Sequence, residues 1–114
     1  MSVETFQTAA SVDDAIAAIA AGARPVAGGT DLVVGARQGK RPLPPSLVAI
    51  HRIADLHSIE EDTGLVRLGA LATHAEIVAH PAIRTRLTAL ADASAIVGSH
   101  ATRAHGTIGG NVMN

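Results

Sequence analysis

The chain has 114 residues, enough for one core, and 47% of them are apolar, as in globular proteins. Nine basic and ten acidic residues give a net charge of −1, and Phe6 is the only aromatic residue. Without a basic stripe or rings on which bases could stack, nucleic-acid binding is not expected. Because there is no cysteine, the chain has no disulfide and cannot ligate an iron–sulfur cluster by itself.

The chain shows no sign of a membrane segment or a secretion signal. Its longest apolar run, Ala15 to Ala21, is far too short to span a bilayer. The first residues include Glu4 and lack the basic region of a signal peptide. We therefore expect a soluble, cytoplasmic protein without a membrane span.

The first part of the chain begins with a predicted strand and helix. A weak alternation over Val3–Gln7 predicts an edge strand, and Ser11 with Asp14 predicts a helix start. Gly22 is a suitable helix stop. Four apolar residues fall on one face of this helix: Ala15, Ile16, Ile19 and Ala20.

A second strand and helix and a third strand follow. The strand covers Pro25–Ala27, and the helix, capped by Thr30 or Asp31, runs to about Gln38. A proline-rich loop then leads to an apolar strand over Leu47–Ile50. The order strand, helix, strand, helix, strand favours a small parallel sheet.

The pattern changes near residues 51–56, where we place a boundary between subdomains 1–55 and 56–114. After a helical turn at Ile53–Leu56, the strands Ser58–Glu61 and Leu65–Gly69 flank a hairpin signal. Thr73 and Glu76 resemble a capping box that opens a helix over Ala75–Ala79. A further helix is predicted from Pro81 to Val97.

The last part of the chain is predicted to be irregular. Gly98 breaks the preceding helix, and a polar loop covers His100–Gly106. Thr107–Asn111 is interpreted as a glycine turn.

Two glycine segments, Ala27–Leu32 and Thr107–Asn111, are the candidates for chemistry. Glycine lets the backbone approach a ligand oxygen closely, and the first segment enters a helix N-terminus, where free amides favour a phosphate. Either segment taken alone is also compatible with an ordinary turn. Gly28-Gly29 does not fit the Rossmann fingerprint, and Gly39-Lys40 does not fit a P-loop.

The charged and histidine residues do not form a recognisable catalytic or metal site. The six histidines include no H-E-x-x-H motif, so no metal site and no catalytic residue are assigned. His100 and His105 are interpreted as loop residues. Solvated charges are the interpretation for the remaining candidates: Asp13, Asp14, Glu60, Glu61, Asp62, Arg84, Arg86 and Arg103.

The motifs are more specific in combination than singly. In chain order they are Ala27-Gly28-Gly29-Thr30-Asp31-Leu32, Leu68-Gly69-Ala70, Thr73-His74-Ala75-Glu76, Ile96-Val97-Gly98-Ser99 and Thr107-Ile108-Gly109-Gly110-Asn111. The set resembles the FAD-binding domain of the molybdenum hydroxylases, the flavoprotein subunit or central domain of enzymes such as xanthine dehydrogenase and carbon monoxide dehydrogenase.

The resemblance implies an α/β (α+β) fold of the PCMH type. A small βαβ subdomain with a parallel sheet would be followed by the start of a second subdomain with antiparallel strands. It also implies cofactor contacts at two pyrophosphate-holding segments and one stretch along FAD. The residues are Val26, Ala27, Gly28, Gly29, Thr30, Asp31 and Leu32, then Thr107, Gly109, Gly110 and Asn111, and along the cofactor Val97 and Gly98.

The resemblance further implies an oxidoreductase component. FAD would receive electrons from a molybdopterin-binding large subunit and an iron–sulfur small subunit and would pass them to an acceptor. The family continues beyond the position of Asn114, so we expect a truncated domain that binds FAD weakly or not at all and is not active alone. Two alternatives remain open: an assembly module without flavin, and an inactive fragment that self-associates.

Overall fold

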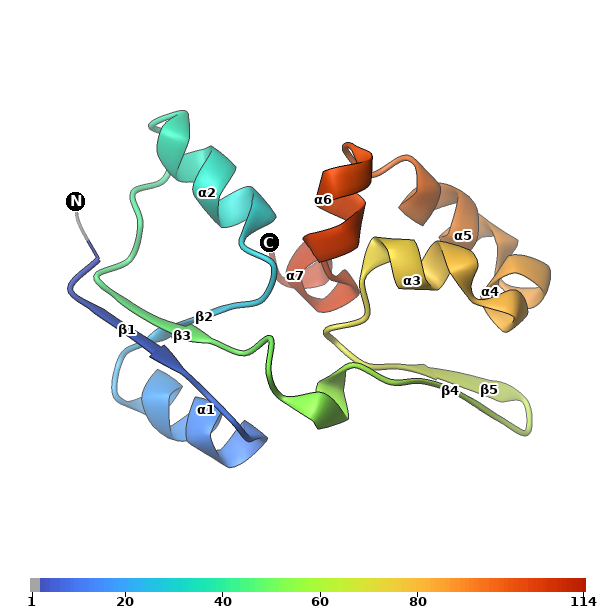
Figure 1. Ribbon diagram of the computed structural model, residues 1–114, viewed down its shortest axis with the longest axis horizontal. Helices are drawn as coiled ribbons and strands as arrows, with labels where there is room; N and C mark the ends of the chain where they lie inside the picture. The colour runs from blue at the N-terminus through green and yellow to red at the C-terminus, as the bar shows by residue number, and fades with distance from the viewer. Residues whose placement is uncertain (1–2) are drawn as a thin grey trace. The chain divides into compact units, whose positions relative to one another are not determined.

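The computed structural model describes residues 3–114. The chain divides into two compact units, Met1–Ala54 and Asp55–Asn114, and a 3-10 turn, η1 (Ala54–Leu56), stands at the division (Figure 1). The first unit contains β1 (Thr5–Thr8), α1 (Val12–Ala20), β2 (Arg24–Val26), α2 (Thr30–Arg37) and β3 (Ser46–Ala49). The second contains β4 (Ile59–Asp62), β5 (Leu65–Leu68), α3 (His74–Ala79), α4 (Pro81–Arg86), α5 (Thr88–Ala95), α6 (His100–His105) and α7 (Ile108–Met113).

The first unit is built on a three-stranded parallel sheet in the order β1-β3-β2. Phe6 on the edge strand pairs with Leu47, and Val26 pairs with Ala49. The three consecutive residues Leu47, Val48 and Ala49 are all buried, as expected for a central strand covered on both faces. The parallel sheet and the edge position of the first strand confirm the sequence prediction.

Helix α1 begins and ends as predicted, but it packs through a different face. The Ser11 side chain accepts a hydrogen bond from the Asp14 amide, and Gly22 adopts a φ of 105° after the helix. The buried residues are Ala15 and Ala18, whereas Ile16 is 58% exposed. Of the four residues predicted to share an apolar face, only Ala15 is buried, and Ala18, three residues further on the same side of the helix, is buried in place of Ile16, Ile19 and Ala20.

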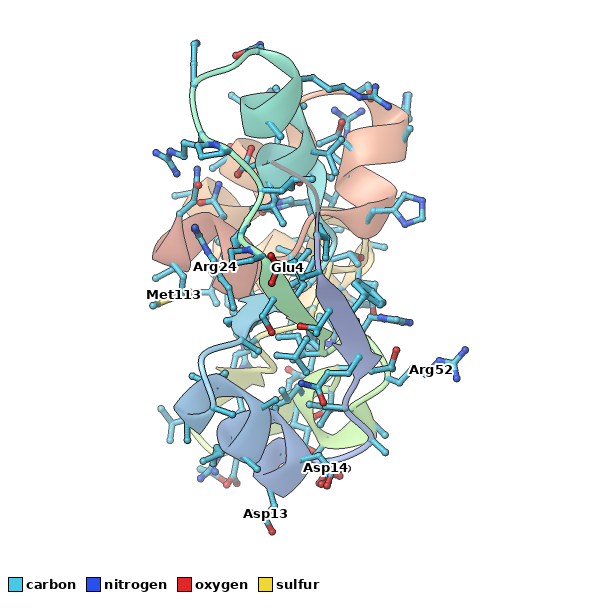
Figure 2. All side chains as sticks on the ribbon, turned by 90° about the vertical axis from the view of Figure 1, so that its left-hand side faces the viewer. Glu4, Asp13, Asp14, Arg24, Arg52 and Met113 are labelled. Carbon is cyan, nitrogen blue, oxygen red and sulfur yellow. The ribbon has the colours of Figure 1, made fainter. Side chains whose placement is uncertain are left out.

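The carboxylates at the start of this helix are solvated, as predicted. Figure 2 shows Asp13 and Asp14 at the N-terminal end of α1, where both side chains are exposed. Asp14 accepts a long hydrogen bond of 3.4 Å from the Ala10 amide. Both lie in the first turn, where negative charge is favourable to the helix dipole.

The second unit begins with the predicted hairpin. Strands β4 and β5 are antiparallel, and Glu60 lies opposite Arg67, a pair of opposite charges on neighbouring strands. Gly64 in the connection has a φ of 76°, a value that favours glycine. The hairpin signal is confirmed, and Glu60, Glu61 and Asp62 are exposed.

The core of the second unit forms where α3, α4 and α5 meet the hairpin. The capping box at α3 is confirmed: the Thr73 hydroxyl accepts from the Glu76 amide at 3.2 Å, and the Glu76 carboxylate accepts from the Thr73 amide at 3.2 Å. Four buried apolar residues form the centre of this core. They are Ala72, Ile77, Ile83 and Ala91, with Ile59, Val66, Leu68, Leu90 and Ile108 packed around them.

Three predictions for the second half were wrong. The single helix from Pro81 to Val97 is two helices, α4 and α5, because the backbone at Leu87 leaves the helical region with φ −124° and ψ 52°. The polar loop over His100–Gly106 is instead helix α6, which the Ser99 hydroxyl caps by accepting from the Thr102 amide. The second glycine turn is the beginning of helix α7.

Over residues 3–114, no helix is long and apolar enough to cross a membrane.

Candidate functional site

The first glycine segment connects β2 to α2 and places Gly29 at the N-cap of the helix. Gly29 adopts φ 74° and ψ 3°, a left-handed conformation that a β-branched residue adopts only with strain. The expected cap by the side chain of Thr30 or Asp31 was wrong, since α2 begins at Thr30 and has no side-chain cap. The helix N-terminus therefore keeps its backbone donors for another partner.

Five consecutive amides, from Gly28 to Leu32, have no acceptor among the residues that the structure describes. The three in the first turn of α2 lie at the positive end of an eight-residue helix. Asp31 brings a carboxylate to this turn, so its contribution to an anionic ligand is its amide and not its side chain. Such a row of donors has the chemistry of a phosphate site.

The second glycine segment is organised differently, because its amides are used within the fold. Ile108 donates to the Ala72 carbonyl at 2.9 Å and Gly109 to the Ala70 carbonyl at 2.8 Å. Gly110 donates to the Thr107 hydroxyl at 3.0 Å, and Asn111 donates to the Thr107 carbonyl at 3.0 Å. This segment is thus fastened to Ala70–Ala72, with Thr107 as the N-cap of α7.

Gly109 is needed for packing. A Cβ at this position would lie 2.6 Å from the carbonyl oxygen and 2.9 Å from the Cβ of Ala70. By contrast, Gly110 is exposed, and a Cβ there would meet only the Thr107 hydroxyl, at 3.0 Å. Of the predicted residues in this segment, Thr107 is buried, while Gly110 and Asn111 remain accessible to a ligand.

The predicted cofactor stretch Val97–Gly98 forms the turn before α6. Gly98 has a φ of 51° and is exposed. The Arg103 guanidinium donates through Nη1 to the carbonyls of Val97 and Gly98, at 3.1 and 2.9 Å. The interpretation of Arg103 as a solvated charge was wrong. Nothing in the sequence indicated these hydrogen bonds, because Arg103 follows the two carbonyls by six and five residues and lies in a segment that was predicted to be a loop.

The structure gathers the predicted residues in three places. Val26–Leu32 lies in the first unit, at the β2–α2 connection. In the second unit, the Val97–Gly98 turn precedes α6 and Thr107 follows it, so one helix of six residues, roughly 9 Å long, separates them. Among residues 3–114, no three histidine or carboxylate side chains gather into a group that could hold a metal ion.

Comparison with known proteins places these segments in a family context. The family model described as the FAD binding domain in molybdopterin dehydrogenase matches residues 2–114. The chain is 38% identical over 87 residues to the nicotinate dehydrogenase FAD-subunit of Eubacterium barkeri, covering 76% of this chain and 29% of that subunit. It is 32% identical to the 6-hydroxypseudooxynicotine dehydrogenase complex subunit alpha of Paenarthrobacter nicotinovorans, covering 96% of this chain and 38% of the relative.

The fold agrees with a solved structure of a related enzyme. Reconstituted CO dehydrogenase from Oligotropha carboxidovorans superposes with a TM-score of 0.90 at 29% identity, covering the whole of this chain and 40% of the compared one. The mixed α/β fold, with its parallel sheet and antiparallel pair, is thereby confirmed. The chain spans less than half the length of each of these proteins.

Proposed function

Because this chain belongs to the family of FAD-binding domains of molybdopterin dehydrogenases, we propose that it binds FAD and holds the pyrophosphate at the β2–α2 connection. The observation that carries the proposal is the row of five amides from Gly28 to Leu32 without acceptors among the described residues. These donors fit a pyrophosphate, which offers several charged oxygens to backbone N–H groups.

The residues around this row support the same assignment. Val26 and Ala27 are half-buried at the end of β2, and Leu32 is half-buried in α2, so they provide apolar surface beside the donors. The left-handed Gly29 directs the chain from the strand into the helix. We assign Val26 to Leu32 to cofactor binding, with backbone amides as the polar contacts.

In this proposal the second glycine segment makes fewer polar contacts with FAD than the first. Gly110 and Asn111 are exposed and are assigned as direct contacts. Thr107 and Gly109 act mainly by holding α7 against Ala70, since their polar groups are already bonded within the fold. Val97 and Gly98 offer half-buried and exposed backbone, respectively, for the remainder of the cofactor.

The physiological role proposed is that of a flavin-carrying component of an electron-transfer complex. When bound, FAD supplies the redox chemistry, relaying electrons from molybdenum and iron–sulfur partner subunits to an acceptor. The names of the relatives, a FAD-subunit and a complex subunit, support assembly with such partners. Strongly exposed apolar side chains in the second unit would suit contacts with further protein: Ile96, Val112 and Met113.

Equilibrium dialysis tests the pyrophosphate assignment directly. The chain is dialysed against FAD in the presence of excess ADP or excess riboflavin. ADP, which carries the pyrophosphate, is expected to displace FAD, whereas riboflavin, which carries only the ring, is expected to displace little. Displacement by riboflavin alone would show that the ring and not the pyrophosphate is held, and would contradict the assignment.

A further inference from the structure

Arg103 makes contacts that the cofactor assignment does not use. From the middle of α6, its side chain reaches back to the turn before the helix, where one guanidinium nitrogen donates to two successive main-chain carbonyls, those of Val97 and Gly98. Arg103 is half-buried, unlike the exposed Arg84 and Arg86 of α4. Two hydrogen bonds from one charged donor to neighbouring carbonyls fix the direction in which that short stretch of backbone points.

The same turn is also restrained from the side of its glycine. Gly98 has a φ of 51°, and a Cβ added there would lie 2.9 Å from the Thr102 Cγ2 atom. Ser99, the next residue, caps α6 and accepts the Arg103 amide at its carbonyl, at 2.9 Å. The turn is therefore tied to α6 by the backbone of Arg103, by its side chain and by the close approach of Thr102.

The guanidinium also supplies charge at this place. Both hydrogen-bond partners that the guanidinium has among the described residues are neutral carbonyls, so these bonds do not neutralise its positive charge. By engaging the two carbonyl oxygens, it turns their negative ends toward itself. The Val97 N–H donates to the Ser94 carbonyl at 3.4 Å, so among the described residues the Gly98 N–H is the donor that this stretch keeps for a ligand, beside a positive charge that favours an anionic one.

We propose that Arg103 is a positioning residue that holds the Val97–Gly98 turn in the conformation in which it contacts the cofactor. The inference rests on the proposed function, since it assigns Arg103 a role toward the same FAD site. A purely structural arginine would change the stability of the second unit. A positioning arginine changes, in addition, how Val97 and Gly98 respond to FAD in a chain that remains folded.

The test is an NMR titration of the ¹⁵N-labelled chain with FAD, which detects weak binding residue by residue. Four proteins are compared: wild type, Arg103→Gln, Arg103→Lys and the control Arg86→Gln, which removes the same charge from an exposed site of the same unit. In wild type and Arg86→Gln, we expect FAD to shift the amides of Gly28–Leu32 and of Val97–Gly98.

In Arg103→Gln, the shifts at Val97 and Gly98 are expected to vanish and the dissociation constant for FAD to rise about tenfold, while Gly28–Leu32 still respond. Arg103→Lys keeps a charged donor and is expected to restore much of the FAD-induced shift at Val97 and Gly98. If Arg103→Gln does not fold, Arg103→Lys is the variant that tests the inference. FAD binding by Arg103→Gln indistinguishable from wild type, or a folded Arg103→Lys no better than Arg103→Gln, would overturn the inference. No FAD-induced shift at Gly28–Leu32 in wild type would overturn the proposed function and the inference with it.

Discussion

The substitution Gly109→Ala separates a glycine needed for packing from one exposed to a ligand. In the structure, the Gly109 amide donates to the Ala70 carbonyl at 2.8 Å, and a Cβ on Gly109 would lie 2.6 Å from that same oxygen. The added methyl therefore cannot be accommodated without moving α7 away from Ala70. The movement weakens the hydrogen bond and disturbs the contact between the two backbones.

The size of the effect follows from opposing contributions. Loss of one backbone hydrogen bond costs about 1 kcal/mol, and forcing a methyl into a closed contact costs about 1–3 kcal/mol. Alanine in place of glycine within a helix returns about 1 kcal/mol. We expect Gly109→Ala to lower the free energy of unfolding by about 2 kcal/mol. For a unit of this size, that loss corresponds to a fall of roughly 10 °C in Tm.

Gly110→Ala is the matched control one residue along the same helix. Its Cβ would meet only the Thr107 hydroxyl, at 3.0 Å, so a gain of about 1 kcal/mol in helix propensity is offset by a weakened cap of similar size. Urea denaturation followed by circular dichroism measures both variants. Equal stability of Gly109→Ala and Gly110→Ala would refute the view that the close contact with Ala70 requires glycine at position 109.

Three further outcomes are expected. Gly29→Val should weaken FAD binding at least tenfold in equilibrium dialysis. The control Gly39→Val changes a glycine with a similar φ of 69° outside the segment, so it should lose comparable stability but keep its affinity for FAD. Equal FAD affinities of the two variants would contradict the assigned site. Added zinc should leave Tm unchanged, and a concentration-dependent rise that His100→Ala abolishes would show a metal site. Residues 1–114 alone should bind FAD weakly, and fusion to the remaining part of the Eubacterium barkeri subunit should tighten binding, because more ring area leaves water at ~25 cal/mol per Å²; tight stoichiometric binding by the unfused chain would contradict this expectation.

The sequence was most informative where a local signal and its structural cause lie in the same few residues. Ser11 and Thr73 bond to amides three residues on, and Gly64 occupies the left-handed position of a hairpin. The apolar run at Leu47–Ala49 marks a strand buried on both faces. Each of these features predicts its element without knowledge of the rest of the chain.

The failures occurred where distant residues decide the conformation. Gly109 and Gly110 suggest a turn, but their amides bond to Ala70 and to the Thr107 cap, which makes them the first turn of a helix. Ala15 and Ala18 form the buried face of α1, although Ile16 and Ile19 are the more hydrophobic residues, so hydrophobicity alone does not identify that face. Arg103 acts on carbonyls at the far end of a short helix, and its charge in the sequence carries no sign of that contact.

The position of the pyrophosphate in a crystal structure tests the central claim most directly. The protein to crystallise is the fusion of residues 1–114 with the remaining part of the Eubacterium barkeri subunit, grown with FAD. We predict pyrophosphate oxygens within about 2.7–3.2 Å of amide nitrogens in the Gly28–Leu32 row, the range of N–H···O hydrogen bonds. A fully occupied FAD whose phosphates contact none of these amides would contradict the account.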